Sequence, residues 1–218
     1  MSGVKRVFGR LEAGFDLLYL AAALAISLTL LLGSPSRPQA LAGLMGLALV
    51  SGDALHLLPR VRAALTGGEL ELAQALGLGK LAASITMTVF YLLLWRTGLL
   101  LFDPALPPLA TFCVYGLGLI RILLCLLPQN RWTERHPPLN WAVYRNIPFV
   151  LLGAGAAWLY GANQGRVPAL TPLASAIALS FIFYLPVVLW GERRPRLGML
   201  MLPKSCAYIW MLAMFLPL

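Results

Sequence analysis

Charged residues are scarce in this chain: they make up 11% of its 218 residues, whereas hydrophobic residues make up 60%. Soluble domains have closer to about 25% charged residues, so the composition excludes a soluble globular protein. The mean hydropathy of +0.80 agrees with that exclusion. We therefore expect an integral, multi-pass protein of the cell (inner) membrane.

Cysteine and histidine are also rare, with three cysteines and two histidines in the whole chain. The cysteines, Cys113, Cys125 and Cys206, all lie within apolar segments, and an odd, buried set predicts no disulfide framework. One histidine, His56, lies in an apolar segment and the other, His136, in a loop, so no closed set of metal ligands is expected. We expect no metal ion and no other cofactor, and we interpret the cysteines as small packing residues.

The net charge of +9 does not indicate nucleic-acid binding. The basic residues are distributed between apolar segments and do not gather in a patch, as they would on a nucleic-acid-binding face. Basic residues that flank membrane spans and set their orientation explain most of the excess. We expect no nucleic-acid partner.

Seven apolar segments are long enough to cross the membrane core, which is roughly 30 Å thick and takes about 20 helical residues. Glycine, proline and charged residues separate them. Each is predicted to be a helix, because backbone in lipid must satisfy its own hydrogen bonds and no strand-like alternation appears. The prediction is one all-α transmembrane domain over residues 1–218, with helices at 14–33, 40–59, 77–95, 108–127, 142–160, 169–190 and 198–217. Pro203 would lie within the last helix as a kink.

Lysine and arginine predict the orientation, because they are enriched in cytoplasmic loops. With the N-terminus inside, the cytoplasmic side carries Lys5, Arg6, Arg10, Arg60, Arg62, Arg131, Arg135, Arg193, Arg194 and Arg196. The other side carries only Arg37, Arg96 and Arg166. We expect a cytoplasmic N-terminus and a C-terminus on the outside.

A polar stripe marks the second segment. Asp53, His56 and Arg60 are spaced at i, i+3 and i+7, so they share one face of a helix. A charged side chain near the middle of a membrane helix costs roughly 2.5–3.5 kcal/mol on insertion scales, and such residues usually turn toward the protein interior. The stripe therefore predicts a polar site inside the helix bundle.

Charged residues occur at a similar depth in the cytoplasmic half of every segment. The acids of this layer are Asp16, Asp53 and Glu192, and the bases are Arg60, Lys80, Arg121, Arg145 and Lys204. The bases exceed the acids by two, and buried charge is costly unless it is compensated. A bound anion would supply the missing negative charge.

The layer predicts a cytoplasm-facing basic pocket that binds, and in one interpretation transports, an anionic small molecule or a phospholipid headgroup. Asp53 and His56 are the candidate acid/base pair, since a carboxylate can assist a histidine in proton transfer. The candidate ligand-binding residues are Arg60, Lys80, Arg121, Arg145, Asn146, Lys204 and Tyr208. The expected partners are the lipid bilayer and this anion, and the oligomeric state stays open.

Two other interpretations stay open. The Asp-His pair would also suit an intramembrane enzyme that modifies lipids, although no nucleophile is singled out by its spacing. Alternatively, the charges are topological, with side chains that extend to the headgroups, and the protein is an accessory or structural subunit. Hydroxyl groups in line with Lys80, at Ser84, Thr88 and Tyr91, either extend the pocket or bond to carbonyls of their own helix.

Overall fold

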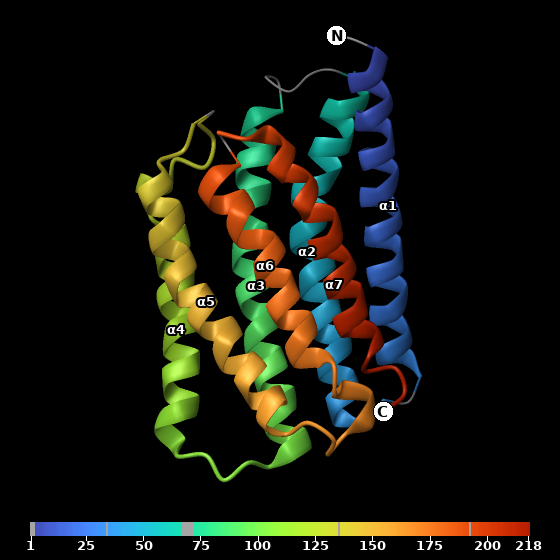
Figure 1. Cartoon of the computed structure of the whole chain (residues 1–218), viewed down its shortest axis with the longest axis vertical. Coiled ribbons are helices and arrows are strands. Elements are labelled where there is room, and N and C mark those ends of the chain that lie inside the picture. Colours follow the sequence, from blue (N-terminus) through green and yellow to red (C-terminus); the bar gives the residue numbers. More distant parts are fainter. Residues whose placement is uncertain (1–2, 34, 67–71, 135, 192) are drawn as a thin grey trace.

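The computed structural model describes residues 3–33, 35–66, 72–134, 136–191 and 193–218, and within these ranges the chain is helical and has no strand (Figure 1). The α-helices are α1 (Gly3–Leu32), α2 (Arg37–Thr66), α3 (Ala73–Phe102), α4 (Pro108–Leu126), α5 (Leu139–Ala162), α6 (Leu173–Trp190) and α7 (Met201–Ala213). Within the described residues, short 3-10 helices lie in the connections before α5, α6 and α7: η1 (Pro128–Asn130), η2 (Pro168–Leu170) and η3 (Pro195–Leu200). The all-α prediction is confirmed for the described residues.

Six of the described helical segments are long and apolar enough to cross a membrane, which makes this a multi-pass membrane protein by length and composition. They are Leu11–Leu32, Arg37–Thr66, Ala73–Phe102, Pro108–Leu126, Leu139–Ala162 and Pro168–Trp190. The last helix, α7, is shorter, with 13 residues. Its expected start was residue 198; instead η3 occupies Pro195–Leu200, and Pro203 lies in the first turn of α7, where proline is tolerated.

Several helices are longer than their apolar segments. The predicted third span ends at residue 95, whereas α3 continues past Arg96 to Phe102. An arginine does not interrupt a helix; α3 ends where Asp103 takes up a left-handed conformation (φ 39°) and donates its N–H to the carbonyl of Leu99. Helix α2 likewise continues past Pro59 to Thr66.

Helix α3 is central to the bundle. It contacts α2, α4 and α5, and its contact with α2 is the most extensive in the structure. Helices α1 and α4 lie at opposite edges, as Figure 1 shows. The first helix packs on α2 and α7, and α6 lies between α5 and α7. Aromatic side chains of α3, α5 and α7, such as Phe90, Tyr91, Phe149 and Tyr208, fill the middle.

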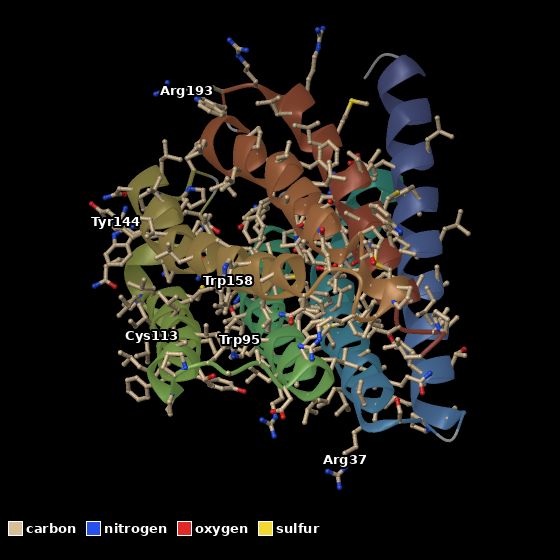
Figure 2. All side chains as sticks on the ribbon, turned by 60° about the horizontal axis from the view of Figure 1, so that its bottom comes forward. Arg37, Trp95, Cys113, Tyr144, Trp158 and Arg193 are labelled. Atoms are coloured by element: carbon tan, nitrogen blue, oxygen red, sulfur yellow. The ribbon has the colours of Figure 1, made fainter. Side chains whose placement is uncertain are left out.

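The two ends of the bundle differ. At one end α1, α3, α5 and α7 begin and α2, α4 and α6 end; Arg193 extends from this end and Arg37 from the other (Figure 2). The surface around the bundle is apolar, with many exposed leucines, as lipid contact requires. Cys113 and Cys206 are exposed on this surface, so only Cys125 is the buried packing residue that we expected.

Candidate functional site

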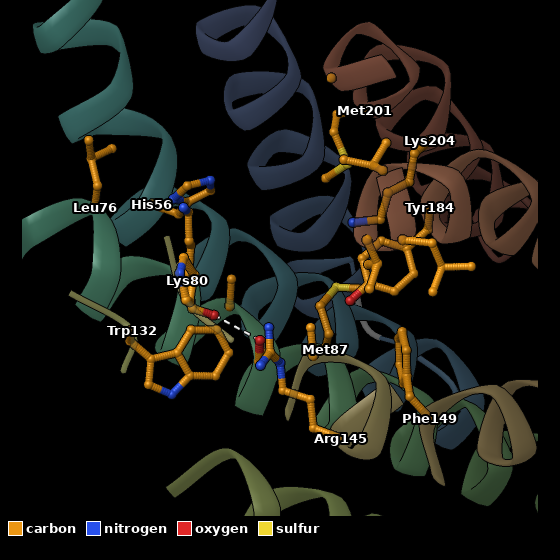
Figure 3. A pocket seen from close by; sticks show the side chains of 18 of the residues that line it. His56, Leu76, Lys80, Met87, Trp132, Arg145, Phe149, Tyr184, Met201 and Lys204 are labelled. Carbon is orange, nitrogen blue, oxygen red and sulfur yellow. Dashed lines mark hydrogen bonds between the residues drawn. The ribbon is translucent and has the colours of Figure 1, made fainter. Parts of the chain in front are cut away.

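A cavity of about 540 Å³ lies in the half of the bundle where α1 begins. Helices α2, α3, α5, α6 and α7 line it, together with Arg121 of α4, η3 and the loop between η1 and α5. Figure 3 shows His56, Arg145 and Lys204, from three different helices, pointing toward one space. The cavity is therefore lined by elements that are far apart in the sequence.

Seven of the nine predicted site residues line this cavity: Asp53, His56, Arg60, Lys80, Arg121, Arg145 and Lys204. Helical spacing explains part of this result, because the three residues of α2 share one helical face, and all three line the cavity. The other two lie behind the lining. Asn146 accepts a hydrogen bond from Tyr184, and the ring of Tyr208 lies 5.2 Å from the Lys204 ammonium.

Arg121 is the most deeply buried cation of the cavity, at 2% exposure. Its guanidinium carbon lies 3.4 Å from the centre of the Phe149 ring, which is a cation–π contact. Its Nη1 donates only long bonds of 3.4 Å, to the carbonyl oxygen of Arg145 and to Oδ1 of Asn146, and its Nε has no partner. No acidic group of the described residues pairs with it.

Lys204 is buried at 8% exposure, and its ammonium lies 5.2 Å from the rings of Tyr184 and Tyr208. It interacts electrostatically with Asp53, although the two form no ion pair. Asp53 instead accepts a hydrogen bond of 2.6 Å from the hydroxyl of Tyr19 on α1. The Asp53 carboxylate thus bonds to Tyr19 of α1 and also faces the cavity, so it compensates only part of the positive charge of Lys204.

Asp53 and His56 have different neighbours in this structure. No hydrogen bond joins the two side chains among the described contacts; the His56 ring lies beside the backbone of Leu76, near the charges of Lys80 and Arg60. Its Nδ1 is buried without a partner. The geometry places both residues on the cavity wall without coupling them as an acid/base pair.

Arg60 forms an ion pair with Glu12 of α1, at the rim of the cavity. The charged layer predicted from the sequence omitted Glu12, although its spacing of four residues from Asp16 puts both acids on one face of α1. Asp16 is buried at 5% exposure, and one of its carboxylate oxygens has no partner. Asp16 does not line the cavity. Because Arg60 is paired with Glu12, Arg60 adds little unpaired positive charge to the site.

The loop after α4 covers one side of the cavity. The side-chain amide of Asn130 donates to the carbonyls of Leu124 and Leu127, at 2.6 and 2.9 Å, and so ends α4. Arg145 donates to Oδ1 of Asn130 at 2.8 Å, and its guanidinium lies 4.2 Å from the ring of Trp132. Sequence reasoning missed Asn130 and Trp132, because only the fold brings this loop to Arg145.

The hydroxyl groups of α3 were expected either to extend the pocket or to bond to carbonyls of their own helix, and both arrangements occur. Ser84 and Thr88 donate to carbonyls of their own helix, at 2.8 and 2.9 Å, although Ser84 also lines the cavity. Tyr91 lies deeper, and its hydroxyl oxygen is 3.2 Å from the hydroxyl oxygen of Ser180 and 3.3 Å from that of Tyr208. These three hydroxyls form a buried cluster beneath the cavity.

Basic residues dominate the charge of the cavity. Its basic lining residues are Arg60, Lys80, Arg121, Arg145, Arg193 and Lys204, whereas Asp53 is the only acidic residue of the described lining. Glu192, which belongs to the predicted layer, lies outside the described residues, as do Arg135 and the side chains of Lys5, Arg6 and Arg10. After Arg60 is paired with Glu12, the described lining still has more basic than acidic groups.

The residues of the site form no metal centre in the described part of the chain, where no group of three His, Cys, Asp or Glu side chains converges. The arrangement instead offers cationic groups, aromatic rings and an apolar wall around one cavity. Comparison of the chain with protein-family models, with curated proteins and with solved structures finds no match.

Proposed function

We propose that this protein crosses the membrane seven times, with its N-terminus in the cytoplasm, and that its basic cavity binds an anionic small molecule or the headgroup of an anionic lipid. The seventh span would consist of η3 and α7 together. Six residues that rise about 2.0 Å each and thirteen that rise about 1.5 Å each extend roughly 32 Å, enough to cross the membrane core.

Arg121 carries the proposal. It is 2% exposed and lies within an apolar bundle, yet no carboxylate of the described residues pairs with it. A buried charge without a counter-charge is costly, and the cation–π contact with Phe149 compensates only part of that cost. A bound anion would complete the site.

The neighbouring cations support the same conclusion. Arg145 and Lys204 also form no ion pair in the described structure, and both line the cavity with Arg121. Guanidinium groups bind phosphate and carboxylate oxygens through paired hydrogen bonds, and an ammonium adds a point charge. An acid/base enzyme is less well supported, because no hydrogen bond joins Asp53 to His56 among the described contacts and Asp53 is bonded to Tyr19.

Ligand binding by purified protein in nanodiscs of neutral lipid tests the proposal. Methyl phosphate is a small anionic probe, and octyl phosphate carries the same head on a lipid-like chain. We expect at least one of them to raise the melting temperature, because a ligand that binds only the folded state stabilises it. Arg121→Gln and Lys204→Gln should each weaken that binding about tenfold or more, since hydrogen bonds to charged groups contribute roughly 1.5–3 kcal/mol.

Arg37→Gln is the matched control. It removes one positive charge from an exposed position at the opposite end of the bundle, outside the cavity. Its binding should equal that of the unmodified protein. Equal binding by the Arg121→Gln and Lys204→Gln variants, folded and as stable as the control, would refute the basic cavity as an anion site.

A further inference from the structure

The walls of the cavity differ in character. Charged side chains come from α2, α3, α4, α5 and α7, and from Arg193 at the rim. Helix α6 contributes no charged side chain of its own: its lining residues are Tyr184, Val187, Val188 and Leu189. Gly198 of η3 and Met201 at the start of α7 adjoin them, so the end of α6, η3 and the start of α7 form a mainly apolar wall, with the Tyr184 ring 5.2 Å from the Lys204 ammonium.

The apolar wall extends around the end of α6. Tyr184, Val187 and Val188 are spaced at i, i+3 and i+4 and share one helical face. Leu189 follows Val188 directly and lies about 100° further around the helix, yet it also lines the cavity. The cavity therefore reaches past the inward face of α6 at its last turn, next to η3.

The size and charge of the cavity narrow the class of ligand. Its volume of about 540 Å³ falls in the range of roughly 300–1,000 Å³ that is typical of sites for organic molecules, well above the need of a small inorganic anion. Several cations around one space match a phosphate group, which carries about −1.5 to −2 charges and three acceptor oxygens, better than a single carboxylate.

We propose that the cavity binds a phosphate monoester of an apolar chain, with the phosphate between Arg121, Arg145 and Lys204 and the chain along α6 and η3. This inference rests on the proposed function and deepens it. A phosphate group reaches the site either on a free small molecule or on a lipid, and the chain decides between these sources. The chain would leave the cavity past Leu189 and Gly198 into the bilayer.

A series of alkyl phosphates with a constant head tests the inference. Binding of methyl, butyl and octyl phosphate is measured by calorimetry on protein in nanodiscs of neutral lipid. We expect affinity to rise with chain length, by about tenfold or more from methyl to octyl phosphate, because burial of only two or three methylene groups has that effect. Octanol, which has the chain without the phosphate, should not compete.

Gly198→Leu provides a second variant that leaves every cation in place. A Cβ atom at Gly198 would meet no atom within 4 Å, so this lining position has room for a side chain, and leucine there would narrow the space assigned to the chain. We expect octyl phosphate to bind about tenfold more weakly and methyl phosphate to bind as before. Gly116→Leu is the matched control, because that position on α4 is equally open and lies outside the lining.

The outcomes separate this inference from the proposed function. If methyl and octyl phosphate bind with equal affinity, and Arg121→Gln abolishes the binding of both, the binding of an apolar chain is refuted and the anion site is supported. Binding of octyl phosphate that Gly198→Leu leaves unchanged would also refute the assigned path of the chain. Binding of neither probe, or binding that Arg121→Gln and Lys204→Gln do not weaken, would overturn both.

Discussion

At the scale of single residues, the hydrogen bond from Tyr19 to Asp53 joins α1 to the wall of the cavity. The donor ring is 2% exposed, and the O–O distance is 2.6 Å. Tyr19→Phe keeps the ring and removes only the hydroxyl, so the carboxylate loses its closest partner. We expect a loss of about 1–3 kcal/mol in stability, which thermal unfolding of the purified protein would show as a lower melting temperature.

Tyr115→Phe is the control for this change. Its ring is 40% exposed on α4, and removal of its hydroxyl should leave the melting temperature unchanged. If Tyr19→Phe unfolds at the same temperature as this control, the bond between α1 and Asp53 contributes nothing to stability.

Sequence reasoning placed Asp53, Arg121 and Lys204 at one depth, because depth follows from the count of residues to a helix end. The partners of the charged residues were not predictable in the same way. Tyr19, Glu12 and Asn130 meet Asp53, Arg60 and Arg145 only through the packing of neighbouring elements. The periodicity of one helix states which face a residue occupies, but it carries no information on which helix lies opposite.

At the scale of elements, close packing of α2 on α3 positions His56. A Cβ atom on Gly79 of α3 would overlap the carbonyl oxygen of Leu55 and lie 2.6 Å from the Cα of His56. These are backbone atoms, so Gly79→Ala must push the two helices apart. We expect a destabilisation of about 1–3 kcal/mol, as for other overpacked sites, seen as a lower melting temperature.

Gly116→Ala supplies the comparison, since a Cβ atom there meets nothing within 4 Å. That variant should be as stable as the unmodified protein, or slightly more stable because alanine favours the helix. A Gly79→Ala protein with an unchanged melting temperature would contradict the close approach of α2 and α3.

Helix positions followed from hydropathy, but helix lengths did not. Apolar stretches marked the middle of each element, whereas α2 and α3 both extend to 30 residues past arginines that a count of hydrophobic residues treats as boundaries. A helix ends where its backbone is redirected, as at Asp103, and hydropathy does not report backbone angles. The 3-10 conformation of η3, before α7, is likewise a matter of backbone angles and is not visible in hydropathy.

At the scale of the whole molecule, the cavity and most of the basic residues share one end of the bundle. Among the described side chains, Arg62, Arg131, Arg193, Arg194 and Arg196 belong to this end, and Arg37, Arg96 and Arg166 to the other. If this distribution orients the chain in the membrane as we propose, it also orients the cavity. A cavity that faces the cytoplasm would be accessible to cytoplasmic phosphate compounds and to lipids of the inner leaflet.

Reporter fusions test this orientation. Because basic residues are retained in the cytoplasm, we expect the end of the bundle with Arg193 to be inside and the end of α7 to be outside. Alkaline phosphatase, active only outside the cytoplasm, should be active when fused after Leu218 and inactive when inserted in the loop at Arg131. A fluorescent protein that matures only in the cytoplasm should give the opposite pattern. Cytoplasmic signals at both sites would mean that η3 and α7 do not cross the membrane, and exchanged signals would place the cavity on the outer side.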